Sequence, residues 1–473
     1  MTMEGVAWPD EACADSTMGC SETPAQTRRS LVAHLARGAA ALAGSGLVAC
    51  AGPGAAPPAA QGKGCSQPME IYHPFADTSA VAPGLRRVFA DFASSHPQCS
   101  LQPVPIAPFN TEKLIASMAG GAPPPLSMLP PTQVTTWVPQ GLLEPLEPYL
   151  KRDKLAGSDF LPPVWETMSW GGGAWHLPVQ VDPNFPFFWN KAVLRSAGVN
   201  ADRGPQTMDE LDQAAQKINR ESGGQWERLA FVPWQWYGTS NALSAMGYTH
   251  GGTFFDKERK RVTYNHPQVV KGVEWMASWA QRLGGTRARA DQLFAGTNIS
   301  ALIADGKIGF APLVSIAVPA IKQLSPTIEL GHGGLPGATA AQAGVVWTGG
   351  WHVGAIPGSK RTDDAWEFIR WIGASGEGTS AVAQQMGGLP GHAKSPGFEI
   401  LSRDSSMVAH VEAIKRAKFL PHSFYHGVSV DLAPLEQALD GARTVKAALD
   451  EITEKTQVRY EQQQAEQAQK KRS

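Results

Sequence analysis

Cys50 is the residue for which the surrounding sequence most clearly predicts a chemical modification. The stretch Leu47-Val48-Ala49-Cys50 resembles the bacterial lipobox, in which the cysteine thiol is lipidated and the cysteine becomes the new N-terminus. A segment rich in Pro, Ala and Gly follows, and this composition is typical of a flexible tether. We therefore expect Cys50 to carry lipid at the outer face of a membrane, with residues 50–65 as the tether of the folded part.

The residues before this cysteine are typical of an export signal. Arg28 and Arg29 lie in a stretch that resembles the twin-arginine motif, and a weakly apolar run at 38–49 follows them. That run is shorter than the ~20 apolar residues that a membrane-spanning helix needs. We expect residues 1–49 to be an export signal of the twin-arginine type with an atypical, acidic N-terminal extension; the Sec route is the alternative.

Two further cysteines, Cys65 and Cys99, are placed so that a disulfide can form. Each precedes an expected strand, at 69–72 and at 101–106. If these strands are parallel neighbours, their first residues lie side by side, and an oxidising compartment would favour the bond. Two free buried thiols are the alternative. Neither cysteine belongs to a CxxC motif, so we expect no zinc or redox site here.

The sequence lacks the common catalytic motifs. It has no Walker P-loop, no HExxH, no GxSxG and no GxGxxG after a strand. His422 and His426 have the spacing of metal ligands on one helix face, but no carboxylate motif accompanies them. Acidic residues are scattered, so no pair of carboxylates can be chosen for glycoside hydrolysis. We therefore expect no catalytic residue, no metal and no cofactor, and we expect that the protein is not an enzyme.

Charge and composition exclude a further class. The formal net charge is −1, and the short run at 470–472 is the one basic block in the sequence. Since nucleic-acid binding needs a basic face, we expect no nucleic-acid partner. With 42% hydrophobic and 18% charged residues, the chain has the composition of an ordinary globular protein.

Strands and helices alternate after the tether. The expected strand at 69–72 is followed by an amphipathic helix that ends at His96-Pro97, and then by the strand at 101–106. A helix at 110–121 and a strand at 125–129 continue the pattern. This alternation predicts right-handed βαβ units and a parallel sheet, and therefore the α/β class.

The middle of the chain continues the same theme. A strand is expected at 185–190 and an amphipathic helix at 207–220. Thr207 is the expected N-cap of that helix, and Glu210 would complete a capping box. A further strand, at 228–234, leads into a cluster of aromatic residues.

Several segments match, in order, those of a known family. Residues 112–129 match a helix that ends in A-G-G-x-P-P, and residues 137–153 match G-x-L-x-P-L-x-x-Y. Residues 187–211 match a segment of the form Y-N-K…P-x-T-W-D-E-L, and the G-G…A-W-x-F and G-x-L-P elements match 349–372 and 387–392. Over about residues 66–455, the chain thus resembles the extracellular solute-binding proteins of ABC importers. The similarity is to the carbohydrate-binding family, family 1, which includes maltose-binding protein.

The resemblance implies a two-lobed periplasmic-binding-protein fold. Two α/β lobes would be linked by a hinge, with the ligand cleft between them. Crossing strands would lie near 182–187 and near 331–335, and the polar tail 456–473 would be frayed. By analogy, lobe one comprises 66–184 plus 335–380, and lobe two comprises 185–334 plus 381–455.

The resemblance also implies which residues bind a ligand. Sugars offer flat faces of C–H bonds and a rim of hydroxyl groups, so a sugar site needs aromatic platforms and planar polar side chains. The aromatic cluster that starts at Trp234 ends an expected strand, and Trp351 follows Gly349-Gly350, which would let the backbone approach a bound molecule. The residues expected to bind the ligand are His73, Phe75, Phe109, Asn110, Asp182, Asn184, Trp234, Gln235, Trp236, Tyr237, Trp351 and Tyr425.

The function that the resemblance implies is that of a substrate-binding lipoprotein. It would capture a mono- or oligosaccharide by hinge closure and deliver it to the permease subunits of an ABC importer. We expect an extracytoplasmic, lipid-anchored monomer. A receptor for glycerol phosphate or a glycerophosphodiester is an alternative with the same fold, and it would need a cation or a helix N-terminus at the cleft. A lipid-anchored envelope glycosidase and a sensory binding module are alternatives from other classes.

Overall fold

The computed structural model describes most of the chain after the expected tether. The described residues are 68–77, 81–106, 111–235, 238–315, 317–345, 347–405, 407–416 and 430–470. Within these ranges, no helix has both the length and the apolar character needed to cross a bilayer. The predictions for the export signal, for Cys50 and for Cys65 fall outside the described residues.

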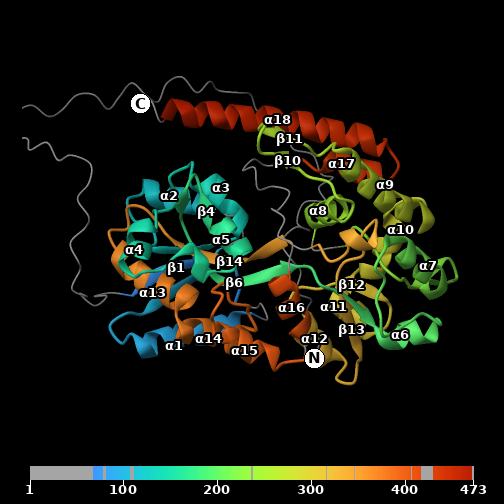
Figure 1. Ribbon diagram of the computed structural model, residues 1–473, viewed down its shortest axis with the longest axis horizontal. Helices are drawn as coiled ribbons and strands as arrows, with labels where there is room; N and C mark the ends of the chain where they lie inside the picture. The colour runs from blue at the N-terminus through green and yellow to red at the C-terminus, as the bar shows by residue number, and fades with distance from the viewer. Residues whose placement is uncertain are drawn as a thin grey trace, which may run out of the picture. The chain divides into compact units, whose positions relative to one another are not determined.

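The larger sheet has five strands. They are β1 Met69–His73, β2 Leu101–Pro105, β3 Leu126–Leu129, β6 Leu177–Asn184 and β14 Trp347–Ala355. Their order is β2-β1-β3-β14-β6. Strands β1, β14 and β6 are labelled in Figure 1. Strand β1 is parallel to β2 and β3, whereas β14 is antiparallel to β3 and β6. The predicted parallel neighbours are confirmed as β1 and β2, with Met69 opposite Leu101.

The burial of these strands follows their place in the sheet. All four residues of β3 are buried, as expected for a central strand covered on both faces. The edge strand β2 is mostly exposed, and its Pro103 and Pro105 lack the N–H groups that an additional strand would need. Helices α1 (Ala82–Ser95) and α2 (Thr111–Ala119) connect the three parallel strands and complete the two predicted βαβ units.

The smaller sheet has three strands and is antiparallel. They are β7 Phe187–Asn190, β12 Phe310–Pro312 and β13 Leu330–Gly333, in the order β12-β7-β13. The strand expected at 185–190 is therefore confirmed as β7. The rings of Phe187 and Phe310 stack across this sheet with centroids 5.5 Å apart, so the sheet packs through its aromatic side chains.

The remaining elements are helices and short hairpins. The longer helices are α4 Glu147–Arg152, α5 Pro162–Met168, α6 Lys191–Ser196, α7 Met208–Ile218, α8 Thr239–Thr249, α9 Pro267–Arg282, α11 Ile299–Ala304, α12 Ala317–Leu324, α13 Thr362–Ala374, α14 Gly376–Met386, α15 Gly397–Ser402, α16 Val408–Arg416, α17 Ala433–Leu439 and α18 Val445–Lys470. The one-turn helices are α3 Val134–Trp137 and α10 Ala288–Asp291. The hairpins are β4 Ser169–Trp170 with β5 Gly173–Ala174, β8 Arg220–Ser222 with β9 Gln225–Arg228, and β10 Phe255–Asp256 with β11 Arg261–Val262.

Each sheet has a hydrophobic core of its own, as a two-lobed fold requires. The first core surrounds the five-stranded sheet, and its members before the crossing end at Val181. The second core surrounds the three-stranded sheet and begins at Phe185. The chain therefore passes from one core to the other between these two residues, inside the predicted range 182–187.

The return crossing lies later in the chain than the family analogy suggested. Trp347 still belongs to the second core, and Val353 belongs to the first, so the chain returns along β14. The crossing expected near 331–335 is wrong, because β13 pairs with β7 inside the second sheet. Most buried apolar side chains between Ala381 and Ile414, expected in lobe two, pack in the first core, whereas Ala409 packs in the second. One reason is the close packing of α14 on α1, where a Cβ on Gly84 would lie 2.3 Å from the Gln385 carbonyl oxygen.

The C-terminal helix is longer than expected. A frayed tail was predicted from residue 456, but α18 continues to Lys470. Thr456 and Tyr460 are buried, and the Tyr460 ring lies edge-on to Phe255 with centroids 5.2 Å apart. These contacts anchor the middle of α18 on the second core and explain why the helix does not end at 456.

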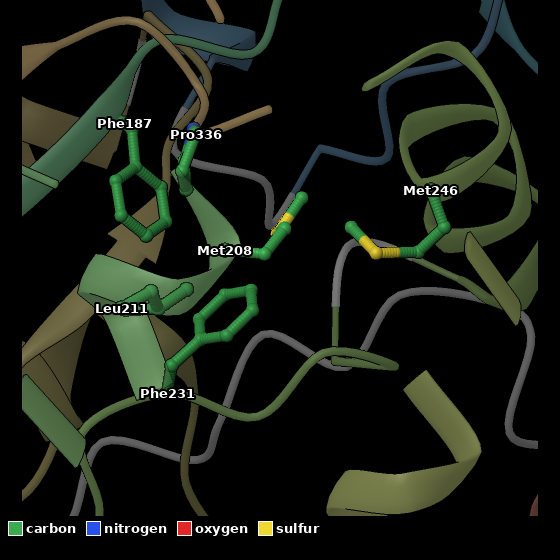
Figure 2. A pocket seen from close by; sticks show the side chains of 6 residues that line it. All are labelled: Phe187, Met208, Leu211, Phe231, Met246 and Pro336. Carbon is green, nitrogen blue, oxygen red and sulfur yellow. The ribbon is translucent and has the colours of Figure 1, made fainter. Parts of the chain in front are cut away.

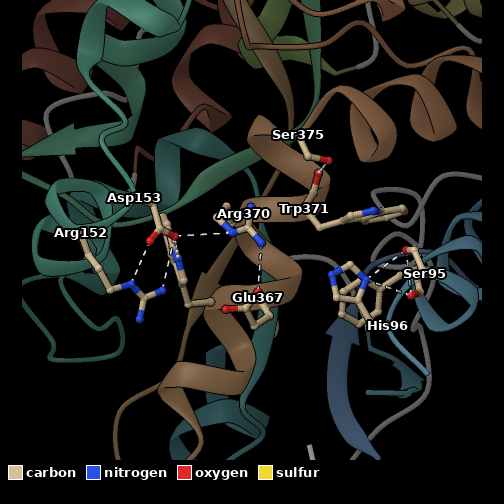
Figure 3. Close-up of polar contacts among 10 residues, drawn as sticks. Ser95, His96, Arg152, Asp153, Glu367, Arg370, Trp371 and Ser375 are labelled. Atoms are coloured by element: carbon tan, nitrogen blue, oxygen red, sulfur yellow. Dashed lines mark hydrogen bonds and ion pairs between the residues drawn. The ribbon is translucent and has the colours of Figure 1, made fainter. Parts of the chain in front are cut away.

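Helix α13 is fastened to α4 by a small network of charges (Figure 3). The Asp153 carboxylate accepts hydrogen bonds from Arg152 at 2.9 Å and from the Trp366 indole at 2.7 Å. Arg370 lies 3.5 Å from the same carboxylate and also donates to Glu367 at 3.1 Å. The ring of Trp371 packs on the other side of α13 against Phe92 of α1. This network supports the first sheet rather than any reactive site.

Candidate functional site

Several predicted ligand residues meet at one edge of the larger sheet. Strands β1, β3 and β6 run in the same direction, since both β3 and β6 are antiparallel to β14. His73 ends β1, and Asp182 and Asn184 lie at the end of β6. The first half of β14, which carries Trp351, lies beside them. The carboxyl ends of the strands thus collect these four residues, as the general rule for α/β sheets predicts.

Phe75 and Trp351 form an aromatic pair at this edge. Their rings meet edge-on, with centroids 5.5 Å apart. Phe75 is buried, whereas Trp351 is half-buried and packs against the first core. The chain segment after β1 and the middle of β14 are therefore joined through their side chains. The part of the Trp351 ring that stays accessible is the larger aromatic surface at this edge.

His73 is a buried neighbour of this pair. Its imidazole stacks on Phe75 with centroids 6.5 Å apart and lies edge-on to Phe89 at 6.2 Å. Burial lowers the pKa of His73, and the nearby Asp77 carboxylate acts in the opposite direction. Within the described part of the chain, its Nδ1 atom has no hydrogen-bond partner. His73 is thus a neutral imidazole with one unused polar atom beside the aromatic pair.

The glycine pair before Trp351 has a different role from the expected one. Gly350 has a φ of 105°, and a Cβ there would lie 2.3 Å from the Gln180 carbonyl oxygen. A Cβ on Gly349 would lie 2.5 Å from the Asn184 side chain. The two glycines therefore permit close approach to β6 of the same sheet. The glycines were expected to let the backbone approach a bound molecule, but the group that they let approach is strand β6.

Asp182 connects the edge of the larger sheet to the second core. Its Oδ1 accepts a hydrogen bond of 3.2 Å from the main-chain N–H of Ser315, just after β12. The residue is 7% exposed. Burial raises the pKa of the Asp182 carboxyl to about 6, and the hydrogen bonding by Ser315 acts against this rise. Gln180, two residues earlier on the same strand, is also buried, and its Oε1 has no partner among the described residues.

Trp234 and Gln235 share one acceptor. The indole N–H of Trp234 and the amide of Gln235 donate to Oδ1 of Asp291, over 2.7 and 2.8 Å. Trp234 is 4% exposed and belongs to the second core, so its ring does not offer the free platform that its place after a strand suggested. Gln235 is half-buried and remains the better candidate of the two for contact with a ligand.

The other predicted positions fall outside the described residues. These are Phe109, Asn110, Trp236, Tyr237 and Tyr425, together with Cys50, Cys65, His422 and His426. Cys99 is disulfide-bonded, so it is not the free thiol of the alternative, while the predicted pairing with Cys65 stays a prediction. No group of three or more His, Cys, Asp or Glu side chains in the described ranges could hold a metal ion.

An apolar void in the second core is not a ligand site. Figure 2 shows the six side chains around it, which come from β7, α7, α8 and the segments near them. The void is too small to hold a water molecule. It is lined by Phe187, Met208, Leu211, Phe231, Met246 and Pro336.

Sequence reasoning missed Gln180, Asp291 and Ser315. Gln180 could have been included, because it faces the same side of β6 as Asp182 in the alternation of a strand. Asp291 and Ser315 carry no such signal. Asp291 is 56 residues from Gln235, and Ser315 is 133 residues from Asp182, so only the folded chain brings them together.

Known proteins resemble this chain in sequence. The family model described as bacterial extracellular solute-binding protein matches residues 76–378. A maltotriose-binding protein of Pyrococcus abyssi (strain GE5 / Orsay) is 20% identical over 290 residues, which are 60% of this chain and 58% of that protein. The chain therefore matches less than two thirds of the length of this relative.

Solved structures resemble the fold over most of its length. CpMnBP1 with bound mannobiose has a TM-score of 0.70 at 21% identity, covering 81% of this chain and 98% of that one. The sugar-binding protein MalE of Xanthomonas citri has a TM-score of 0.66 at 18% identity, covering 84% and 98%. These matches confirm the expected two-lobed α/β fold. The family model matches more than half of this chain. The chain therefore belongs to the bacterial extracellular solute-binding protein family.

Proposed function

We propose that this chain is the substrate-binding lipoprotein of an ABC importer and that its substrate is a neutral mono- or oligosaccharide. The sugar would bind where the edge of the larger sheet meets the second core, and closure of the two lobes around it would be the state that the permease recognises. The remaining predicted ligand residues, Phe109, Asn110, Trp236, Tyr237 and Tyr425, are part of this proposal.

The observation that carries the proposal is the arrangement at the end of β1 and β6. The partly accessible Trp351 ring, supported edge-on by Phe75, offers an apolar surface for the C–H face of a sugar. Asp182 and Asn184 on β6 lie beside the same stretch of β14 and offer planar groups for hydroxyl groups. An aromatic surface next to carboxylate and amide groups is the combination that a sugar requires.

The charge of this group of residues favours a neutral ligand over a phosphate ester. The group formed by His73, Phe75, Asp182, Asn184 and Trp351 contains one carboxyl and no lysine or arginine. Burial lowers the pKa of His73, so this imidazole does not supply a positive charge near neutral pH. A phosphate would need a cation that this group does not provide. We therefore rank glycerol phosphate and glycerophosphodiesters below sugars.

The relatives support the same ligand class. The named ligands are mannobiose for CpMnBP1, cycloalternan for a substrate-binding protein of Listeria monocytogenes, and maltotriose in the name of the Pyrococcus abyssi protein. These are different oligosaccharides held by one fold. Identities near 20% leave the choice among sugars to experiment.

The two cores suggest a revised division into lobes. We propose that lobe one comprises about 68–184 and 348–414, and that lobe two comprises about 185–347 and 430–470. Two of the connections between them would be the end of β6 and the start of β14, which pair with each other from Trp347 opposite Asn184. A hinge built from two paired strands can bend while the two cores stay rigid.

A thermal-shift screen tests the proposed ligand class. The chain starting after Cys50 would be heated with mono-, di- and trisaccharides, with glycerophosphodiesters and with amino acids. A sugar at a hundred times its dissociation constant should stabilise the protein by ~2.7 kcal/mol. Stabilisation by amino acids or peptides alone would contradict the proposal, and hydrolysis of any oligosaccharide in the screen would instead favour a glycosidase.

The membrane anchor needs a separate test. The full chain and its Cys50→Ser variant would be expressed in a bacterial host and fractionated. We expect the full chain in the membrane fraction in a detergent-extractable, lipid-labelled form and the variant in the soluble extracytoplasmic fraction. Equal distribution of the two proteins would remove Cys50 as the lipidation site without affecting the ligand proposal.

A further inference from the structure

We propose that Asp291 is a positioning residue of the sugar site, acting through Gln235. It would set the orientation of the Gln235 amide so that the carbonyl Oε1 faces the ligand as an acceptor for a sugar hydroxyl. The proposal rests on the proposed function, because it assigns Gln235 to the binding surface of the second lobe. Asp291 itself would not contact the sugar.

The first support is that two consecutive side chains converge on one carboxylate oxygen. Trp234 and Gln235 donate to the same Oδ1 of Asp291 at 2.7 and 2.8 Å, and both bonds have a charged acceptor. The main-chain N–H of Gln235 donates to the carbonyl of Val232 at 3.1 Å, which closes a tight turn. The turn is thus fixed by its backbone and by both of its side chains.

The chemistry of the amide determines which end is held. A carboxylate accepts hydrogen bonds and cannot donate them, so the NH₂ group of Gln235 must face Asp291. The carbonyl oxygen is on the opposite branch of the same planar group and is directed away from the carboxylate. Because Gln235 is half-buried and Trp234 is buried, the glutamine is the member of the pair that a ligand can reach.

The chain segments that carry Asp291 and Gln235 are both anchored near helix α17. Arg287, one residue before α10, makes a two-pronged contact with Asp440, the residue directly after α17, at 3.1 and 2.8 Å, and its main-chain N–H donates to the same carboxylate at 3.0 Å. On α8, which follows the turn in sequence, Thr239 donates to Glu436 of the same helix α17 at 3.3 Å. Helix α17 therefore supports both α10, which carries Asp291, and the chain segment that follows Gln235.

A similar contact elsewhere in the chain can serve as a control. It separates an effect of Asp291 on the orientation of Gln235 from an effect on the stability of the fold. Asp212 of α7 accepts a hydrogen bond from the Trp279 indole at 2.8 Å, and Trp279 is also buried in the second core. The second donor to this carboxylate is Arg282, at 3.2 Å, in place of a glutamine amide. Replacing Asp212 should therefore show the cost of losing such a bond without affecting the orientation of Gln235.

The test compares binding and stability in four variants of the chain cut after Cys50. Asp291→Ala, Asp291→Asn, Gln235→Ala and Asp212→Ala would be titrated by calorimetry with the saccharide that most stabilises the wild type, starting from mannobiose and maltotriose. We expect Asp291→Ala to weaken binding about tenfold or more. Asp291→Asn retains an acceptor oxygen and should stay within about threefold of the wild type. Asp212→Ala should lower Tm but leave the affinity within about twofold.

The decisive measurement is the double variant Asp291→Ala with Gln235→Ala. If Asp291 acts through Gln235, the double variant should bind as weakly as Gln235→Ala alone, whereas independent effects would multiply. Multiplying effects, wild-type affinity in Asp291→Ala, or equal weakening by Asp212→Ala would each overturn the proposal. If Asp291→Ala does not fold, Gln235→Glu replaces it; this variant keeps an acceptor oxygen but has no N–H group to donate to Asp291, so unchanged affinity would also overturn the proposal. A wild type that binds no saccharide would instead refute the proposed function.

Discussion

The main-chain N–H of Ser315 donates a hydrogen bond to Oδ1 of Asp182, and this 3.2 Å contact joins the two sheets of the protein. Asp182 lies on β6 of the larger sheet, while Ser315 follows β12 of the smaller one. Because the carboxyl is buried, its pKa rises to about 6. The carboxyl is therefore still mainly ionised at neutral pH, although burial disfavours its charged form.

This relationship predicts that Asp182→Asn stabilises the ligand-free protein at neutral pH. The folded-state pKa of about 6 lies above the ordinary value of 3.8, so the contribution of Asp182 to stability is complete below pH 3.8 and is lost as pH rises through 6. The loss is on the order of 2 to 3 kcal/mol. Asparagine keeps an acceptor for Ser315 without the charge. Calorimetric melting should show a higher Tm for the variant at pH 7.5 and a smaller difference near pH 4.

A matched control for this prediction is Asp305→Asn, since Asp305 is exposed. Its Tm should follow that of the wild type at every pH. A lower Tm of Asp182→Asn at all pH values would mean that the charge itself stabilises the junction of the two sheets. If Asp182 also binds sugar, the same variant should bind the sugar more weakly although it is more stable.

Acid should destabilise the protein through its buried histidines. His410 is fully buried, stacks on Phe188 at 5.4 Å and donates from Nε2 to the Leu313 carbonyl at 2.9 Å. Burial lowers the pKa of His410 to about 4, and burial lowers that of His176 to about 3. Since these values lie below the ordinary 6.5, the stabilisation is present above pH 6.5 and is lost as pH falls toward 4.

The variant His410→Gln tests this contribution. Glutamine can still donate to Leu313 but takes up no proton, so the variant should lose less stability between pH 7 and pH 5 than the wild type. The difference could approach ~2 kcal/mol, because His410 in the unfolded chain binds a proton over this range. Urea unfolding at the two pH values measures it. An equal loss in both proteins would assign the acid sensitivity to other groups, of which the buried contact between His176 and His352 is the first to test.

Local rules predicted the local features of this fold well. The side chain of Thr207 accepts a hydrogen bond from the Glu210 N–H, as predicted for the N-cap of α7. The Glu210 carboxylate accepts from the N–H of Gln206, one residue before the position that a capping box requires. The parallel pairing of β1 with β2 also followed from the spacing of strand and helix. Each of these features depends on residues that are close in sequence or on a single βαβ unit.

Features that depend on distant pairing could not be predicted. The four-residue strand β13 reads like a crossing segment, but its pairing with β7, more than a hundred residues earlier, places it inside the second lobe. Trp234 was expected to be accessible because it follows a strand. It is instead packed in the second core, and its indole N–H donates to Asp291, 57 residues later, which no motif marks. The sequence could therefore place the site at the ends of strands, but it could not show which side chains there are accessible to a ligand.

The aromatic pair at the edge of the larger sheet gives the most direct test of sugar binding. Trp351→Ala removes a half-buried ring that we place against the sugar, so its affinity should fall about tenfold or more, with a smaller loss of stability. Phe75→Ala removes a buried ring and should lower the free energy of unfolding by about 3 kcal/mol as well as weaken binding. Calorimetric titration and urea unfolding separate the two effects.

The control for the aromatic pair is Trp226→Ala. Trp226 is another half-buried tryptophan, held by a hydrogen bond from its indole to the Leu283 carbonyl at 2.9 Å. Its loss should reduce stability but not affinity. Unchanged affinity in both Trp351→Ala and Phe75→Ala would remove the aromatic surface from the proposed site.

The disulfide of Cys99 predicts a large effect of Cys65→Ser. If Cys65 is the partner, the bond closes a loop of about 34 residues, and its removal should cost about 3 to 4 kcal/mol of stability through the entropy of the unfolded chain. The chain cut after Cys50 would then contain no free thiol before reduction and one free thiol in the variant. Thiol titration and urea unfolding measure both quantities. Two free thiols in the cut wild-type chain before reduction would show that Cys99 pairs with a cysteine before residue 51.

One ion pair offers a way to measure how the two lobes hold together. Glu166 of α5, in the first lobe, lies 3.2 Å from Lys257 in the β10–β11 turn of the second, with side chains that are 44% and 65% exposed. Such an exposed pair contributes only about 0 to 1 kcal/mol to stability. If the contact forms only when the lobes close, however, this energy adds directly to the closing equilibrium and therefore to the apparent affinity.

The prediction is a small, salt-dependent coupling between these two residues in sugar binding. Glu166→Gln and Lys257→Met should each weaken binding by up to about fivefold, and the double variant should be no weaker than either single variant. The effect should decrease at high salt, because exposed charges are screened. The control is the pair Lys446 and Asp450, at 2.6 Å. Both residues lie on helix α18, so removing this pair should not change the closing equilibrium of the lobes. Additive effects of Glu166→Gln and Lys257→Met that do not depend on salt would show that this contact is unrelated to closure, because two charges that stabilise only the closed lobes must act as one unit.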